Sequence, residues 1–180
     1  APDAPFADLE PLRTILADAR IVQLGENTHG DGACFEAKAR LVRFLHEEMG
    51  FDVLAFESGL WECDRANEAL RKGDAEGAMT SSVFPIWHTA PVRGLFRYLA
   101  DRAKSDRPMT LAGFDCRRSG GTANRFLDEI ESVVAGADVA PLRALEKAMW
   151  EQGDEYAPAA ADVKAADAAW TALRAAFDAK

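Results

Sequence analysis

The chain has 180 residues, 48% of them hydrophobic, so it is long enough to bury a core as one domain or as a large part of one. Twenty-one basic and thirty acidic side chains give a formal net charge of −9, and this negative field disfavours nucleic acid and anionic lipid as partners. No apolar run approaches the roughly eighteen residues that a membrane-spanning helix needs, so we expect no membrane partner either.

Hydrophobic spacing predicts helices and strands that alternate along the first two thirds of the chain. The expected elements, in chain order, are a helix within 5–18, a strand at 21–24, a helix at 34–49, a strand at 51–56, a weak helix at 62–82, a loop at 84–87, a helix from Pro91 and a strand at 109–114.

The order of these elements predicts the fold class. Strands separated by helical crossovers favour right-handed parallel connections, so we expect a layered α/β/α domain with a mostly parallel sheet in residues 1–120. Residues 121–180 are rich in alanine and acidic side chains, and their amphipathic stripes predict a helical segment. Because three strands are few for a parallel sheet, we expect this segment to continue into a further C-terminal part.

The cysteines and the first residues bear on the compartment. Cys34, Cys63 and Cys116 are odd in number and form no CxxC pair, which argues against a disulfide framework or a zinc site and predicts small buried side chains. The chain begins APDAP without an initiator Met, as a trimmed chain or a mature N-terminus would. The cytoplasm and the periplasm both stay open.

An acidic residue stands at the end of each predicted strand, where the following loop begins: Glu26, Glu57 and Asp115. The carboxyl ends of parallel strands form one edge of a sheet, where ligands bind. A single acid there could simply cap a helix, but three acids together with His29 in the first loop predict a shared polar site. Histidine suits proton transfer near neutral pH, and Glu26 could orient the ring of His29. In the alternative interpretation, Glu26 is an acid at the start of a helix and His29 is a hydrogen-bonded loop residue, and neither takes part in chemistry.

Further polar residues are candidates for the same site. Lys38 lies on the apolar stripe of its helix, so its ammonium either reaches a site carboxylate or extends past its neighbours to water. Arg117, two residues after Asp115, could neutralise the acids at this edge or bind an anionic group. His88 is a candidate substrate contact in a loop, whereas His46, beside two glutamates, is expected to be solvated.

Two other kinds of active site are disfavoured. No GxSxG motif is present, so the sequence does not predict the serine triad of an ordinary α/β-hydrolase. Glu-x-x-His spacing binds metal in helix bundles, but there it lies on helices and occurs twice, so we expect no metal and no cofactor.

Three segments resemble the opening half of the erythromycin esterase-like family: IVQLGENTHGDGACFEAKARLVRFLHEEMGFDVLAFESG, PIWHTAPVRGLFRYLADRA and LAGFDCR. The resemblance spans roughly residues 12–117. It implies that Glu26 and His29 are the catalytic Glu and His of the family, that Glu57 is its strand-end Glu, and that Lys38 stands where the family uses a basic residue. It also implies a small-molecule ester substrate, with a macrolactone as one candidate, and a water activated by His29 without a serine intermediate.

The family supplies further histidines from its second half, which this chain does not include. Two other functions remain open from the residues. In a metal-dependent hydrolase the same side chains would be ligands, and in a non-catalytic homologue the pocket would bind a small ligand without turnover. The substrate and the oligomeric state are not predicted.

Overall fold

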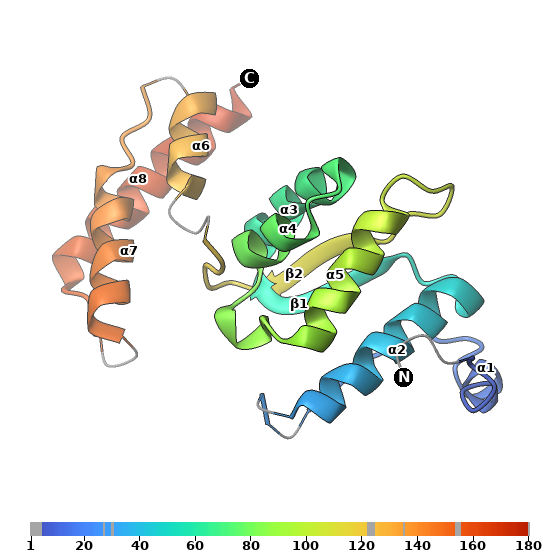
Figure 1. The fold of residues 1–180 in the computed structure, drawn as a ribbon. Coiled ribbons are helices and arrows are strands. Elements are labelled where there is room, and N and C mark those ends of the chain that lie inside the picture. Colours follow the sequence, from blue (N-terminus) through green and yellow to red (C-terminus); the bar gives the residue numbers. More distant parts are fainter. Residues whose placement is uncertain are drawn as a thin grey trace. The chain divides into compact units, whose positions relative to one another are not determined.

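The computed structural model describes residues 5–26, 28–29, 31–121, 125–134, 136–153 and 156–179. The chain divides into two compact units, Ala1–Ala123 and Asn124–Lys180 (Figure 1). The first unit carries the sheet and the second is built from helices. Within the described residues, no helix is both long and apolar enough to cross a membrane.

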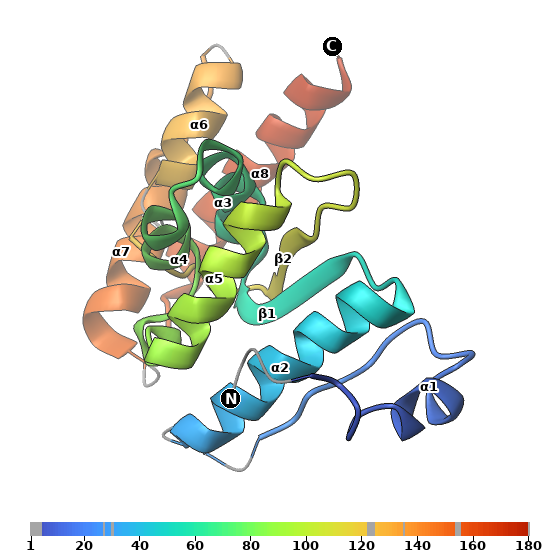
Figure 2. The same ribbon diagram turned by 45° about the vertical axis from the view of Figure 1, so that its right-hand side comes forward.

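The first unit confirms the predicted mixed α/β class with a parallel sheet. Strands β1 and β2 pair in parallel, with Val53 opposite Thr110 and Phe56 opposite Gly113. Helices α2 and α5 pack against each other, as Figures 1 and 2 both show. The elements of this unit are α1 (Pro11–Ile15), α2 (Gly32–Met49), β1 (Val53–Gly59), α3 (Leu60–Lys72), α4 (Ala75–Ser82), the 3-10 helix η1 (Pro85–Trp87), α5 (Ala90–Arg102) and β2 (Thr110–Asp115).

Local capping signals set the limits of α2. The Asp31 side chain accepts hydrogen bonds from the backbone N–H groups of Ala33 and Cys34, which satisfies two donors of the first turn. The helix ends at Gly50, whose φ of 82° is left-handed and favours glycine. The predicted helix at 34–49 is therefore confirmed and begins two residues earlier.

The expected strand at 21–24 is not formed. Among the residues that the structure describes, only β1 and β2 belong to a sheet, and 21–24 makes no ladder. Its side chains do alternate, since Val22 and Leu24 are half-buried while Ile21 and Gln23 are exposed. The alternation thus reflects a segment with one face toward the core, without the backbone pairing that defines a strand.

Two other sequence predictions also change. The first helix is limited to Pro11–Ile15, because none of its residues is buried and tertiary packing therefore does not extend it. Of the cysteines, only Cys63 is buried, and burial raises the pKa of its thiol to about 12. Cys34 is half-buried and Cys116 is exposed.

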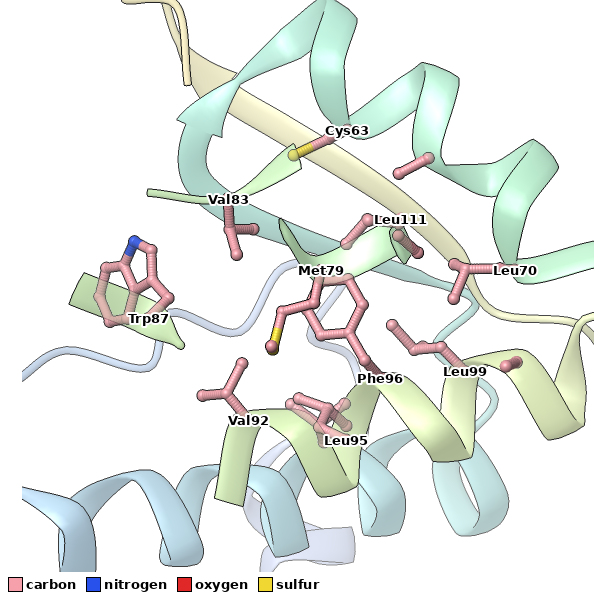
Figure 3. Close-up of a cluster of buried hydrophobic side chains, with 14 of the residues drawn as sticks. Cys63, Leu70, Met79, Val83, Trp87, Val92, Leu95, Phe96, Leu99 and Leu111 are labelled. Carbon is pink, nitrogen blue, oxygen red and sulfur yellow. The ribbon is translucent and has the colours of Figure 1, made fainter. Parts of the chain in front are cut away.

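The core of the first unit lies between the helices and one face of the sheet (Figure 3). In β1, Leu54 and Phe56 pack on this core, whereas Val53 is exposed. Phe114 of β2 is exposed as well. The buried side chains include Leu70 of α3, Met79 of α4, Phe96 and Leu99 of α5, and Leu111 of β2.

A glycine lets the two strands approach each other near their carboxyl ends. A Cβ atom on Gly113 would lie 2.3 Å from the carbonyl oxygen of Ser58 and 2.4 Å from that of Gly59. The pairing register also shifts between Phe56 and Gly59. A side chain at Gly113 would therefore push apart the edge of the sheet that leads into the candidate site.

The second unit confirms the expected helical segment. Its helices are α6 (Phe126–Val133), α7 (Ala140–Gln152) and α8 (Ala160–Asp178). They share a separate core of Leu127, Ile130, Val134, Val139, Leu142, Ala166 and Leu173. These residues of the predicted amphipathic stripes therefore pack on one another, whereas Met149, Val163, Trp170 and Phe177 are exposed.

Candidate functional site

The carboxylate of Glu26 joins two other side chains. Its Oε1 atom is hydrogen-bonded to His29 Nδ1, and its Oε2 atom accepts a hydrogen bond of 2.6 Å from Lys38 Nζ. The side chains of Glu26 and Lys38 are only 11% and 18% exposed, whereas His29 is 51% exposed. A partly buried carboxylate therefore has a cationic partner on one oxygen and an imidazole on the other.

The fold brings this trio together from a loop and a helix. Glu26 and His29 lie on the chain that leads into α2, and Lys38 lies in the second turn of α2. On the same helix Phe35 and Ala39 are buried, and the Lys38 ammonium stands 5.5 Å from the centre of the Phe35 ring. The sequence left open whether the Lys38 ammonium reaches a carboxylate or extends to water, and the structure shows that it reaches the carboxylate of Glu26.

The hydrogen bond to Glu26 determines what His29 can do. A carboxylate only accepts hydrogen bonds, so Nδ1 carries the hydrogen and the neutral ring has its lone pair on Nε2. Half of the His29 side chain is exposed, so solvent contacts the imidazole ring that carries Nε2. This arrangement is suited to removing a proton from water.

A cavity of about 860 Å³ lies beside these residues. Its wall includes Glu26, His29, Lys38 and Glu57, together with Arg20 and Gln23. Apolar side chains make most of the remaining wall, among them Leu24, Val42, Leu54, Phe56, Leu95 and Phe114. A concave apolar site with a few convergent polar groups is the usual form of a small-molecule site.

Glu57 belongs to a second polar group at the same edge of the sheet. Arg117 Nη2 lies 3.9 Å from Glu57 Oε1 and 2.8 Å from Asp115 Oδ2. The backbone N–H of Arg117 also donates to Asp115 Oδ1, at 2.8 Å. These hydrogen bonds hold the pKa of the Asp115 carboxyl below its usual range. The cavity wall includes Glu57 but neither Asp115 nor Arg117.

The structure places the other two histidines away from the cavity. His88 is half-buried, its Nε2 atom lies 3.3 Å from the Val83 carbonyl oxygen, and it does not line the cavity. His46 is only 3% exposed, so the expectation that it is solvated is wrong. Its Nδ1 atom lies 2.5 Å from the Tyr98 hydroxyl of α5, which covers this face of α2.

Trp87 was not singled out from the sequence as a site residue, yet it contacts His29. The two rings are 5.2 Å apart, edge to face at 83°. Trp87 also lines the cavity. An aromatic residue in a loop carries no positional signal, so only the tertiary structure brings it to the histidine.

A buried polar cluster, which the sequence analysis did not predict, lies beneath the same edge. Ser119 Oγ accepts a hydrogen bond of 2.7 Å from the backbone N–H of Gly59 and donates to the Ser82 carbonyl oxygen. Glu62, 1% exposed, accepts a 2.7 Å hydrogen bond from Arg118 Nε. This cluster ties the ends of β1 and β2 to α3 and α4.

Among the described residues, no three His, Cys, Asp or Glu side chains are grouped so that they could hold a metal ion. At the cavity, the Glu26 carboxylate is bonded through one oxygen to His29 and through the other to Lys38.

Comparison of the sequence with known proteins identifies the family of this chain. The model of the erythromycin esterase family matches residues 46–179, a span that includes Glu57 and begins after Glu26, His29 and Lys38. YbfO of Bacillus subtilis, named as a hydrolase, is 38% identical over 124 residues, which are 69% of this chain and 28% of YbfO. Erythromycin esterase type II of Escherichia coli is 28% identical over 148 residues, which are 82% of this chain and 35% of that protein.

Solved structures show the same fold. A succinoglycan biosynthesis protein matches with a TM-score of 0.64 and 25% identity, covering 82% of this chain and 39% of that one. A Bacillus cereus protein matches with a TM-score of 0.59 and 24% identity, covering 83% and 36%. The chain thus spans about a third of the length of each relative. On the match over residues 46–179 and the two curated relatives, the chain belongs to the erythromycin esterase family.

Proposed function

We propose that this chain contributes the catalytic base of an ester hydrolase, with His29 activating the attacking water and Glu26 orienting His29. The observation that carries the proposal is the Glu26 carboxylate, which binds His29 Nδ1 through one oxygen and Lys38 Nζ through the other at the wall of the cavity. The relatives named hydrolase and erythromycin esterase support the reaction class.

In the first step His29 Nε2 takes a proton from a water molecule as its oxygen bonds to the ester carbonyl carbon. The imidazolium that forms is stabilised by the carboxylate of Glu26. When the tetrahedral intermediate collapses, the bond to the alcohol oxygen breaks, and the proton passes from His29 to that leaving oxygen. General-base catalysis of this kind typically contributes about 10²- to 10⁴-fold in rate.

Lys38 and Glu57, two further charged residues of the cavity wall, have supporting roles in this proposal. Lys38 donates a hydrogen bond to the second oxygen of Glu26 and so holds that carboxylate in place. Glu57 is half exposed at the cavity wall, where it can bind the attacking water or a cationic group of the substrate. Asp115 and Arg117 act behind Glu57, at the rim of the site.

The cavity favours an ester with a bulky apolar body. Its volume of about 860 Å³ lies in the upper part of the roughly 300–1,000 Å³ range of small-molecule sites, and most of its wall is apolar. A macrolactone is one ester of this kind, and we propose it as the first substrate to test.

The test is hydrolysis of an ester panel that includes a macrolactone by the complete gene product, its His29→Ala variant and its Glu26→Gln variant. We expect turnover by the wild type, loss of at least about 100-fold in both variants, and no effect of chelator. Glu68→Gln is the matched control, because Glu68 also pairs with a lysine, Lys72, but on the exposed surface of α3.

Other outcomes would assign the site differently. Turnover that chelator abolishes and a metal ion restores would show a metal-dependent hydrolase. Thermal stabilisation by the esters without turnover, equal in wild type and His29→Ala, would show a binding protein and overturn the proposal.

A further inference from the structure

Trp87 is the centre of the ring contacts at the candidate site. It packs edge to face on His29, on Phe35 of α2 at 5.5 Å and on Phe56 of β1 at 5.9 Å. It is only 7% exposed, and Figure 3 shows it at one end of the buried cluster. The side chain therefore joins the rigid core to the half-exposed imidazole of His29.

The local backbone holds this indole in place. Trp87 lies in η1, where its backbone N–H donates to the Phe84 carbonyl oxygen at 2.9 Å. The backbone N–H of Phe84 in turn donates to Ser58 Oγ of β1, at 3.2 Å. The wall behind His29 is thus fastened to the carboxyl end of a strand.

The ring of Trp87, and not its N–H group, makes the contacts at this position. The Trp87 Nε1 atom is buried and, within the described part of the chain, has no hydrogen-bond partner. A buried N–H group without a partner destabilises a fold, and a phenylalanine would fill much of the same space without that cost.

We propose that Trp87 is a positioning residue for His29. The hydrogen bond from Nδ1 to Glu26 holds only one atom of a half-exposed imidazole, so rotation of the side chain can break it. The edge-to-face contact with Trp87 fixes the plane of the ring, so that Nδ1 stays on the carboxylate and Nε2 stays available to water. This role rests on the proposed function of His29 as the base.

The experiment compares Trp87→Leu, which removes the ring, with Trp87→Phe, which keeps a ring and removes the N–H. Phe96→Leu is the matched control, because Phe96 packs on Phe56 in the same cluster but neither contacts His29 nor lines the cavity. The complete protein is used throughout. Two quantities are measured: the ratio of the two neutral His29 tautomers, from ring ¹⁵N shifts, and kcat and KM on an ester that the wild type hydrolyses.

For Trp87→Leu we expect a mixture of tautomers and a loss of kcat of about tenfold or more, with KM changed less than about threefold. Trp87→Phe should keep the wild-type tautomer and a kcat within about threefold of wild type. Phe96→Leu should lower the thermal midpoint and change neither His29 nor kcat.

Two results would overturn the proposal. One is a wild-type tautomer ratio in Trp87→Leu, which would mean that the ring does not orient His29. The other is a Trp87→Phe variant as impaired as Trp87→Leu, which would assign the effect to the indole N–H. Because the tautomer ratio is measured without substrate, a wild type that hydrolyses no ester would refute the proposed function and still leave the positioning role testable.

Discussion

Lys38 Nζ lies 2.6 Å from Glu26 Oε2 and links α2 to the loop before it across twelve positions of the chain. Both side chains are largely buried, so this pair is shielded from water. An exposed pair of the same chemistry and similar geometry, Lys72 with Glu68, lies 2.7 Å apart on α3. Comparing the buried Lys38–Glu26 pair with the exposed Lys72–Glu68 pair therefore tests how burial changes the contribution of a lysine–glutamate pair to stability.

Lys38→Met should lower the free energy of unfolding by about 1–3 kcal/mol, because it leaves a partly buried carboxylate without its charge-assisted hydrogen bond. Lys38→Arg keeps the charge and should lose less. Denaturant unfolding measures both. Lys72→Met serves as the control and should change little, since water and salt already screen that pair. Equal losses in Lys38→Met and Lys72→Met would contradict the structural role.

The stability of the protein should fall in mild acid because of His46. Burial lowers the pKa of this histidine below its ordinary value of about 6.5, and the charge of Arg102 opposes its protonation as well. The unfolded chain therefore takes up a proton first as the pH falls below about 6.5. The contribution of neutral His46 to the free energy of unfolding is therefore complete above that pH. It decreases below that pH, with a slope of up to about 1.4 kcal/mol per pH unit.

His46→Gln removes this titration. We expect the free energy of unfolding of the variant to depend less on pH than that of the wild type between about pH 7 and pH 5. The measurement is a series of denaturant unfolding curves at fixed ionic strength. Parallel pH dependences in the two proteins would show that His46 is not protonated more readily in the unfolded state.

The buried pair of Glu62 and Arg118 should be sensitive to the loss of one partner. Arg118→Met leaves the Glu62 carboxylate, 1% exposed, without its 2.7 Å hydrogen bond, and should cost about 3 kcal/mol. The double variant with Glu62→Gln should be more stable than Arg118→Met alone, because the uncompensated charge is gone. A double-mutant cycle by chemical denaturation tests this, and additive losses would show that the two residues do not interact.

Gly113→Ala should destabilise the sheet by about 2 kcal/mol or more, because its methyl group would overlap the carbonyl oxygens of Ser58 and Gly59. Gly94 in α5 provides the opposite case, since a Cβ there meets nothing within 4 Å. Gly94→Ala should stabilise the protein by about 0.5–1 kcal/mol. Thermal unfolding distinguishes the two, and a harmless Gly113→Ala would mean that the strands separate more easily than the structure indicates.

Several elements could be predicted because their signals are local. A stripe of apolar residues that ends at Gly50 is a property of neighbouring positions, and it predicted α2 to within two residues; the Asp31 cap, which is equally local, accounts for the earlier start. The second and third predicted strands correspond to β1 and β2 for the same reason, since each is a short apolar run with clear ends.

The segment 21–24 shows where such signals stop. Its alternating burial is that of a strand, but whether its backbone pairs with another strand depends on the position of a distant partner. His46 is a similar case. It stands beside charged residues in the sequence, and it is buried only because Tyr98 of α5 packs over it.

For the candidate site, the sequence by itself determined which residue types follow the short apolar runs, and so pointed to Glu26, His29 and Glu57, although the run at 21–24 forms no strand. It could not determine whether the Lys38 ammonium turns to a carboxylate or to water, nor that Trp87 would pack on His29, because both depend on how α2 and η1 lie against the sheet. Patterns along the chain report which face of an element is apolar, whereas contacts between side chains far apart in sequence are set only when those faces pack together.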